Sequence, residues 1–321
     1  MKKNTVNASV GSDNGLEYLP KFKMSFLAPK HWLTWLGVFI LWLLIFTPVK
    51  FRNFLATVIM FFSCKTNKKR YRIAKKNLLM CFPEKSETEL NQIVRRFFYY
   101  KARIFLDYAF LWFSNKKRLQ QIYEIKHDGE MRGLKTLEKN IILLTCHMLA
   151  LDHGAQALSF ESNIVGLVKA IKNPVTDWLI ARGRTRFNTH LYERTYGMMG
   201  IISSIKSGSQ FFYLPDEDLG ESHSEFLPFF GVQKATITAL GRLTKICDAK
   251  VLPCTTIFND QTGKYEIHFM PAMSQYPTGD KVADALAMNQ MLEKLILKAP
   301  EQYIWTFKYF KTRPDNESSI Y

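Results

Sequence analysis

Five short apolar runs between residues 140 and 270 constrain the fold of this chain more than any other feature. Apolar and polar residues hardly alternate within them, and they span residues 141–145, 164–168, 210–214, 251–258 and 265–270. Segments with a helical pattern lie between most of them. Strands that are apolar on both faces are typical of a parallel or mixed sheet covered by helices on both sides. The sequence therefore predicts an α/β fold with a central, mostly parallel or mixed sheet flanked by helices.

A long amphipathic helix is predicted before the first of these strands. Ser86 and Glu89 have the spacing of a capping box, in which each side chain bonds a backbone N–H of the other residue. Apolar residues follow at helical intervals. We therefore expect this helix to begin at about residue 87.

The N-terminal part is predicted to anchor the chain in a membrane. Residues 1–27 form a polar tail, whereas residues 28–64 hold an almost unbroken apolar run at 32–48 and a shorter one at 54–64. A helix over residues 32–48 would be about 25 Å long, a little less than the roughly 30 Å of a hydrocarbon core. Flanking lysine and tryptophan side chains can bridge such a difference. A buried core helix is the alternative.

Positive charge follows the apolar region. The net charge is +16 at pH 7, and seven lysines or arginines lie within residues 65–76. Such clusters collect on the cytoplasmic side of a membrane anchor, next to anionic lipids. We therefore expect residues 65–321 to form one domain on that side. The charge also suits a phosphorylated substrate, an acidic protein or nucleic acid, and the basic and aromatic residues of 300–314 leave base stacking open.

The cysteines favour a reduced chain without a zinc site. Five cysteines are scattered along the sequence, and no pair has the Cys-x-x-Cys spacing. Cys146 stands beside His147, but neighbouring residues of a strand point to opposite faces. This arrangement does not favour a thiol nucleophile paired with that histidine.

His147 lies just beyond the carboxyl end of the first apolar strand, and Asp152 follows five residues later. Ligands of such sheets bind at the carboxyl ends of the strands. If Asp152 lies in the first turns of the next helix, its carboxylate can turn back to the imidazole. A carboxylate in that place fixes the tautomer of a basic histidine and stabilises the imidazolium. The alternative is a histidine that merely ends a strand, with a solvated aspartate.

A second polar group lies on the predicted helix 173–184. Asn173 suits the N-cap and Pro174 the first helical position. At 3.6 residues per turn, Asn173, Asp177 and Arg184 share one face of this helix. Arg184 could donate to a phosphate or a developing oxyanion. It could equally be a solvated basic helix end.

Two carboxylates follow the strand at 210–214. Asp216 and Asp218 could hold a sugar hydroxyl or brace His147, or they could form an Asx-turn. A metal site would have to recruit both of them with His147 and His223. No recognisable ligand spacing supports such a site, so we expect no metal.

Taken in order, these segments resemble the lipid A late acyltransferases, the lauroyl and myristoyl transferases that finish lipid A in Gram-negative bacteria. This family lies within the lysophospholipid acyltransferase superfamily. The resemblance covers nearly the whole chain and rests on these motifs: NLLMCFPE at 77–84, His-x4-Asp at 147–152, NPVTDWLIARGR at 173–184, PDED at 215–218, PFFG at 228–231, and PEQYIW with FKTRP at 300–314.

The resemblance implies that His147 is a general base and Asp152 its partner. The base takes the proton of a hydroxyl on an acyl chain of a phosphorylated glucosamine disaccharide, and that hydroxyl attacks the thioester of a chain on acyl carrier protein. It implies that the reaction uses no covalent acyl-enzyme, no metal and no other cofactor, and that nucleic acid is not a partner. It also implies that the active site lies on the cytoplasmic side of the bacterial inner membrane. Substrate-binding roles carry over to Arg184, Asn173, Asp177, Asp216 and Asp218, and more weakly to Lys169.

Four positions depart from the family pattern. The family usually has glutamate at Asp152, arginine at Lys169, and histidine and arginine at Phe307 and Tyr309. Lysine cannot grip a phosphate with two parallel hydrogen bonds as arginine does. Two other functions stay open, namely a glycerophospholipid acyltransferase and a catalytically inactive, membrane-tethered binding protein.

Overall fold

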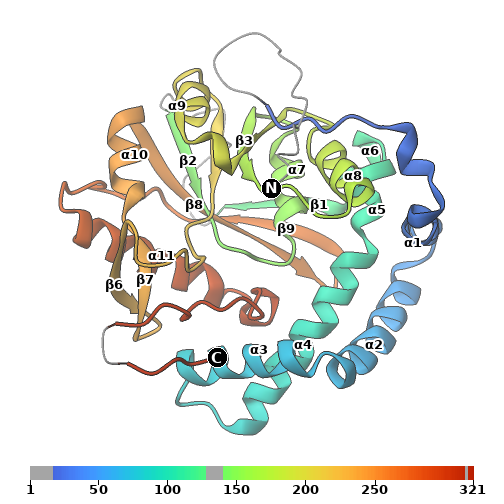
Figure 1. The fold of residues 1–321 in the computed structure, drawn as a ribbon, viewed down its shortest axis with the longest axis horizontal. Helices are drawn as coiled ribbons and strands as arrows, with labels where there is room; N and C mark the ends of the chain where they lie inside the picture. Colours follow the sequence, from blue (N-terminus) through green and yellow to red (C-terminus); the bar gives the residue numbers. More distant parts are fainter. Residues whose placement is uncertain (1–16, 128–139, 315–316) are drawn as a thin grey trace.

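A computed structural model describes residues 17–127, 140–314 and 317–321 of the chain. Its centre is a seven-stranded sheet with the strand order β1-β9-β8-β2-β5-β3-β4 (Figure 1). The strands are β1 (Tyr123–His127), β2 (Asn140–Leu144), β3 (Ile164–Val168), β4 (Thr189–Glu193), β5 (Gln210–Tyr213), β8 (Ala249–Asn259) and β9 (Lys264–Phe269). All neighbours pair in parallel except β8 and β9. The predicted α/β fold with a mostly parallel sheet is confirmed.

Helices cover both faces of this sheet. One face packs on α7 (Leu151–Leu158), with α8 (Pro174–Arg184) and α5 (Tyr108–Phe113) beyond it. The other face packs on the helices of the largest apolar core, which are α3 (Lys68–Cys81), α4 (Glu87–Leu106), α9 (Met199–Lys206), α10 (Ala239–Cys247) and α11 (Lys281–Leu297). The hairpin of β6 (Ser224–Phe229) and β7 (Val232–Ile237) lies beside α11. The remaining short elements are η1 (Met24–Leu27), η2 (Pro29–His31), α6 (Lys116–Ile122), η4 (Arg194–Tyr196) and η5 (Pro300–Gln302).

The predicted capping box is present at the start of α4. The Ser86 side chain accepts from the backbone N–H of Glu89, and the Glu89 carboxylate accepts from the backbone N–H of Ser86. These contacts satisfy two backbone donors that the first turn leaves free. The helix buries an apolar stripe against the sheet domain, as its pattern predicts.

The N-terminal apolar region differs from the single helix expected over residues 32–48. It forms α1 (Trp32–Leu44) and, after a turn at Pro48, α2 (Val49–Thr66). Proline lacks a backbone N–H and disfavours a helical residue before it, so α1 stops short of Pro48. Along the described ranges, none of the helices is both long and apolar enough to cross a membrane.

Buried charges fix α2 to the rest of the fold. Arg52 of α2 and Arg103 of α4 both bind the carboxylate of Asp107, at 2.9 and 2.6 Å. The Tyr265 hydroxyl donates to the same carboxylate at 2.8 Å. Removing one member of such a buried group leaves the others without a partner, which costs several kcal/mol. The helix is therefore part of the packed structure and not a free extension.

The N-terminal tail is described from residue 17 onward, and most of the predicted polar tail lies outside the described residues. Glu17 makes an isolated bridge to Tyr192 of β4, and the Tyr18 backbone N–H donates to the Leu191 carbonyl at 2.7 Å. This part of the chain therefore pairs with the β4 edge of the sheet.

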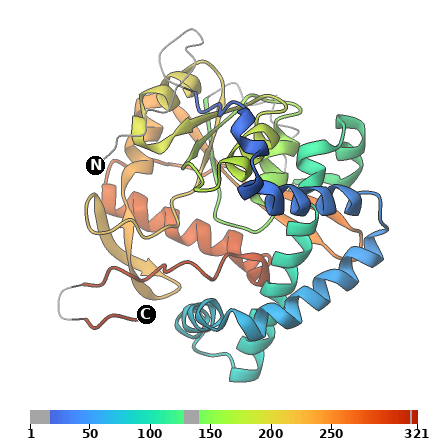
Figure 2. The same ribbon diagram turned by 45° about the vertical axis from the view of Figure 1, so that its right-hand side comes forward.

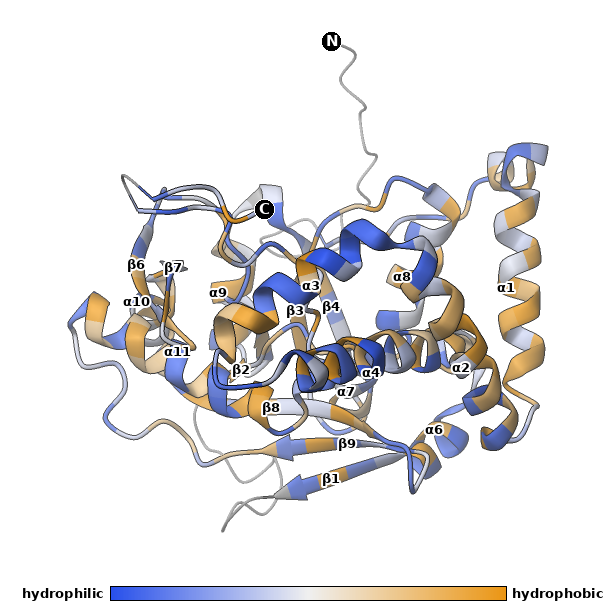
Figure 3. Cartoon of the chain, turned by 90° about the horizontal axis from the view of Figure 1, so that it is seen from below, coloured by the Kyte–Doolittle hydropathy of each residue, from blue (hydrophilic) through white to orange (hydrophobic). Residues whose placement is uncertain are grey.

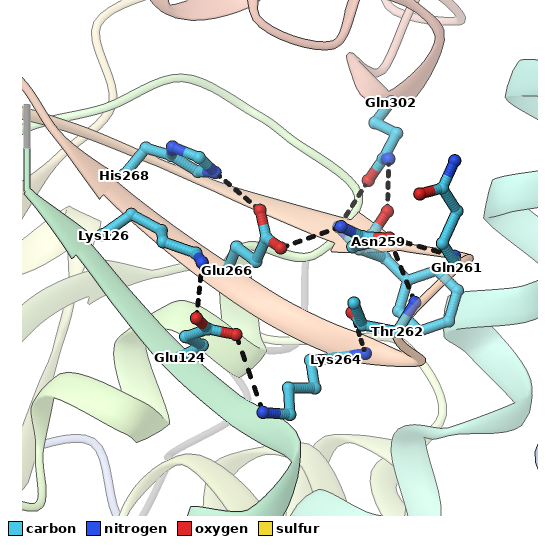
Figure 4. A network of polar contacts seen from close by, with 10 residues as sticks. Glu124, Lys126, Asn259, Gln261, Thr262, Lys264, Glu266, His268 and Gln302 are labelled. Carbon is cyan, nitrogen blue, oxygen red and sulfur yellow. Dashed lines mark hydrogen bonds and ion pairs between the residues drawn. The ribbon is translucent and has the colours of Figure 1, made fainter.

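The C-terminal segment is held against β8. The side chain of Gln302 bonds both the N–H and the carbonyl of Phe258, each at 2.8 Å (Figure 4). Beyond it, the rings of Tyr303, Trp305, Tyr309 and Phe310 are fully buried. Since stacking on bases needs exposed rings, these four aromatic residues cannot serve the nucleic-acid contact that the sequence left open.

Candidate active site

His147 and Asp216 meet at the carboxyl edge of the sheet. His147 follows β2 and Asp216 follows β5, and these two strands are parallel neighbours, so both residues leave the sheet at the same edge. The ring Nδ1 of His147 lies 2.7 Å from Asp216 Oδ1, and the His147 backbone N–H donates to Asp216 Oδ2 at 2.9 Å. The hydroxyl of the buried Tyr303 donates to the same Oδ2 at 2.9 Å.

This arrangement fixes the histidine tautomer. The ionised Asp216 carboxylate can only accept, so Nδ1 carries the proton and Nε2 is left with its lone pair. Asp216 is fully buried, whereas the His147 side chain is 21% exposed and lines a cavity. The histidine thus has the orientation of a general base whose second nitrogen is braced.

The charges around His147 keep it basic. Burial lowers its pKa, but the charge and hydrogen bond of Asp216 outweigh burial, and the net pKa is raised above the ordinary 6.5. Glu217, whose Oε1 lies 3.7 Å from Nε2, raises the pKa further, while Arg194 lowers it. For Asp216, burial raises the pKa, but the His147 charge and hydrogen bonds outweigh it and the pKa is lowered.

Asp152 has a different partner from the expected one. Its carboxylate binds the Arg184 guanidinium with two hydrogen bonds, at 2.9 and 3.1 Å, and accepts from the Tyr108 hydroxyl at 2.8 Å. Among the described residues, no hydrogen bond joins it to His147; the ring contact expected of Asp152 is made by Asp216. The reason is geometric, because Asp152 sits on the side of α7 that packs against α5 and α8.

Of the remaining predicted residues, two brace the start of α8. Asn173 caps that helix as expected, since its Oδ1 accepts from the N–H groups of the next two non-proline residues. Its Nδ2 donates to Thr34 of α1 at 3.1 Å. Asp177 accepts from the Ile171 N–H at 2.8 Å and from the Tyr18 hydroxyl. Neither side chain lines the cavity beside His147.

Asp218 braces a loop. It accepts from the N–H and hydroxyl of Thr312 at 2.6 and 2.8 Å, and from the Gly220 N–H at 3.0 Å. The bond to Gly220 spans two residues, which is the Asx-turn contact left open by the sequence. Gly220 has a φ of 98°, a conformation that favours glycine.

A cavity of about 600 Å³ opens beside His147. Its size is typical of a small-molecule or lipid-chain site. Its wall is mostly apolar, and its basic side chains are Lys169, Arg184, Arg194 and Arg242. Arg184 and Lys169 are thus the two predicted substrate-binding residues that share this cavity with His147 and Asp152.

The sequence profile of the bacterial lipid A biosynthesis acyltransferases matches residues 19–312. The chain belongs to this family. A lipid A biosynthesis acyltransferase of Haemophilus influenzae is 34% identical over 302 residues, 94% of each chain. The lipid A biosynthesis lauroyltransferase of Escherichia coli is 32% identical over 304 residues, 94% of this chain and 99% of the relative. The E. coli myristoyltransferase is 33% identical over 309 residues, 96% of each.

The family resemblance is therefore confirmed, and the protein is an acyltransferase of lipid A biosynthesis. Of the two aromatic residues that depart from the expected pattern, Phe307 contacts the His147 ring and Tyr309 contacts Tyr303, which binds Asp216. The Phe307 ring lies 5.3 Å from the His147 ring in an edge-on contact, and Tyr309 stacks on Tyr303 at 5.0 Å. Both positions thus hold an aromatic ring where the resemblance implied histidine or arginine.

Sequence reasoning missed Arg194 and Arg242 on the cavity wall, and it missed three residues that contact His147, Asp216 or Asp152. Tyr303 lies in the PEQYIW motif, and Glu217 in PDED, so both had a motif as a signal. Tyr108, which binds Asp152, lies in a plain aromatic stretch that gives no such sign. Its role depends on a contact between α5 and α7 that local pattern cannot reveal.

Proposed function

We propose that this acyltransferase moves a fatty acyl chain from the thioester of acyl carrier protein to a hydroxyl on an acyl chain of a phosphorylated lipid A precursor. His147 is the general base. The observation that carries the proposal is the state of His147, whose Nδ1 is held by the buried Asp216 while the ring borders the cavity. No metal or other cofactor takes part in this scheme.

The reaction proceeds by direct transfer. The lone pair of His147 Nε2 takes the proton of the acceptor hydroxyl, and the hydroxyl oxygen attacks the thioester carbonyl carbon. As the tetrahedral intermediate collapses, the C–S bond breaks and the ester is complete. The imidazolium then returns its proton to the departing thiolate. Asp216 stabilises the imidazolium formed in between, as carboxylates beside basic histidines do.

Asp152 and Arg184 act together on the cavity wall. Burial raises the pKa of Asp152, but the charge and hydrogen bonds of Arg184 outweigh it, so the pKa is lowered and the pair stays ionised. Asp152 thereby fixes one edge of the guanidinium. We assign Arg184 and Lys169 to the anionic parts of the substrates, since these cations border the cavity beside the base.

An exposed apolar face on α1 and the basic helix α3 support attachment of the protein to the cytoplasmic leaflet of the inner membrane. Figure 3 shows apolar residues along α1 and α2 and polar ones along α3. The exposed large apolar side chains of α1 and the turn after it are Trp32, Leu33, Leu36, Phe39, Ile40, Trp42, Leu43 and Phe46. Apolar patches of this size on a soluble surface mark contact with a protein or a lipid. Because the basic helix α3 follows α1 and α2 in the chain, we assign this patch to contact with an anionic leaflet.

The test is the mass spectrum of lipid A from a host that lacks its own late acyltransferases. The host carries either the wild-type chain or His147→Ala, both checked for equal amounts in the membrane fraction. The proposal predicts a gain of one fatty acyl group with the wild type only. A well-expressed wild type that adds nothing contradicts the proposal. Equal activity of His147→Ala contradicts the role of the histidine.

A further inference from the structure

The cavity beside His147 reaches both faces of the sheet. Along β5 and just after it, Phe211 and Tyr213 point to one face, and Phe212 and Leu214 to the other. Phe211 packs in the core that contains α9 and α10, whereas Phe212 packs in the core that contains α7. All four side chains line the same cavity. It must therefore pass around the carboxyl edge of the sheet, where His147 lies.

The cavity therefore has two limbs, one on each face of the sheet. The α9–α10 limb is lined by Met198, Ile202, Phe211, Ile237, Leu243 and Ile246. The α7–α8 limb is lined by Ala155, Gln156, Ile164, Gly166, Thr189 and Leu191. His147 borders the cavity between them.

The limbs differ in polarity. Apart from His147 and the Asp152–Arg184 pair, the charged residues that line the cavity are Lys169, Arg194, Glu217 and Arg242, and all four are at least partly exposed to solvent. The α7–α8 limb also contains the Asp152–Arg184 pair and the buried hydroxyl of Thr189, for which the described residues offer no hydrogen-bond partner. The buried polar side chains that line the cavity, Asp152, Gln156 and Thr189, all belong to the α7–α8 limb. The buried part of the α9–α10 limb is therefore apolar, as an unsubstituted fatty acyl chain requires.

The proposed reaction needs room for two chains. The thioester carbonyl belongs to the donor's acyl chain, and the attacked hydroxyl sits on the acceptor's acyl chain. Both chains therefore run away from the point where His147 acts. One apolar limb on each face of the sheet gives each chain its own path.

The two limbs also differ in how near they lie to the exposed apolar face of α1. Helix α8 touches α1 through the Asn173–Thr34 hydrogen bond and through Trp178 and Trp35, whose rings are 6.3 Å apart. In Figure 1, α1 lies at the right of the molecule and the α9–α10 pair at the upper left, and in Figure 2 the blue helices still lie to the right of the yellow and orange pair. A lipid acceptor enters from the membrane, whereas the donor arrives on a soluble carrier.

Resting on the function proposed above, we propose that the α9–α10 limb binds the acyl chain of the donor and the α7–α8 limb binds the acyl chain of the acceptor. The depth of the α9–α10 limb then sets the length of the chain that is transferred. The α7–α8 limb selects the acceptor and does not affect the preference for the length of the donor's acyl chain.

Two filling substitutions test the assignment, one in each limb. Ile202→Trp fills the α9–α10 limb from a partly buried position on α9. Gly166→Leu fills the other; its first added carbon meets Leu191 at 3.7 Å, an ordinary contact, and the rest of the side chain extends into the limb. Each purified full-length variant is assayed with carrier thioesters of increasing chain length and one lipid A precursor.

We expect Ile202→Trp to lower kcat/KM for the longest accepted donor about tenfold, because room for roughly two methylene groups is lost, and to spare shorter donors. Gly166→Leu should raise the KM for the acceptor and keep the donor-length preference. The reverse pattern, or no change of length preference in either variant, overturns the assignment. If the wild type transfers no chain from any carrier thioester, the proposed function itself fails.

Two further measurements protect the test against variants that do not fold. Ile246→Ala widens the α9–α10 limb at a half-exposed position and should shift the preference toward longer donors. A donor thioester with a photoreactive group at its chain end should label α9 or α10 of the wild type. Labelling of α7 or β4 instead overturns the assignment.

Discussion

Replacing Asp216 by asparagine isolates the feature on which the proposed catalysis depends. The Asp216 carboxylate accepts three hydrogen bonds: from the ring Nδ1 of His147, from the His147 backbone N–H and from the Tyr303 hydroxyl. Asparagine has one acceptor oxygen and one donor NH₂ group. If its oxygen keeps the two bonds to the backbone and Tyr303, its NH₂ faces Nδ1. The proton of His147 then moves to Nε2, which can no longer act as a base.

The expected loss is large in rate and small in stability. In serine proteases, the same change beside the catalytic histidine fixes the wrong tautomer and lowers kcat about 10⁴-fold. We expect Asp216→Asn to lower kcat by about 10³- to 10⁴-fold, equivalent to about 4–5.5 kcal/mol of transition-state stabilisation. The assay is transfer from a carrier thioester to a lipid A precursor, quantified by mass spectrometry, with thermal unfolding measured on the same samples.

Two matched variants control for the general effect of losing a carboxylate. Asp284→Asn replaces another buried carboxylate, which binds Thr278 away from the site, and should keep most of the activity. Asp152→Asn weakens the Arg184 pair and should reduce kcat less than Asp216→Asn does. The reasoning is refuted if folded Asp216→Asn keeps more than about a tenth of the activity while Asp152→Asn is nearly inactive. Asp152 would then be the partner of the base.

Three further outcomes follow from the same structure. Since the pKa of His147 is raised above 6.5 by Asp216 against the effect of burial and the base must be neutral, kcat/KM should rise with pH through an apparent pKa above 6.5. A pH–rate profile with its midpoint at or below that value contradicts the assignment. Asp152→Ala should lower the free energy of unfolding, measured by denaturant titration, by about 2 kcal/mol. The loss is smaller than for a fully buried ion pair because the Arg184 side chain is 33% exposed. An unchanged free energy of unfolding would show that the pair does not stabilise the fold. In a sedimentation assay with lipid vesicles, the double variant Phe39→Glu with Leu43→Glu should move from the vesicle pellet to the supernatant. The control variant Lys116→Glu with Lys117→Glu on α6 should stay with the vesicles. Equal sedimentation of both variants would exclude the α1 face as the membrane contact.

Local patterns predicted the parts of this fold that depend on neighbours in sequence. The apolar runs became strands, Ser86 and Glu89 capped α4, and Asn173 capped α8. His147 emerged at the carboxyl end of β2 because a buried strand stops where polar residues begin. Each of these follows from hydrogen-bonding and burial rules that act over a few residues.

The partners of the charged side chains could not be predicted in this way. Asp216 reaches His147 because β5 lies beside β2 in the sheet, and Asp152 is turned away by Arg184 and Tyr108. Both facts depend on strand order and helix packing. The spacing from His147 to Asp152 favoured the nearer carboxylate, although bracing by Asp216 was one of the alternatives left open.

The structure of the N-terminal apolar region likewise depends on a contact that local sequence patterns do not reveal. Hydropathy alone favoured one helix over residues 32–48 and a short apolar stretch after it. The structure has two helices, and Arg52 of the second is buried against Asp107. A buried arginine is acceptable only with a partner from elsewhere in the chain, and a sequence window of this length does not contain Asp107.

A single-turnover reaction of the purified protein tests the central claim most directly. Wild type and His147→Ala are each mixed with a carrier thioester, with and without the lipid A precursor, and the masses of protein and precursor are read at early times. The account predicts one added acyl group on the precursor with the wild type, a loss of about 10²- to 10⁴-fold with His147→Ala, and no acylated protein in either case. An acyl group on the protein before the precursor is added, or undiminished transfer by His147→Ala, would contradict it.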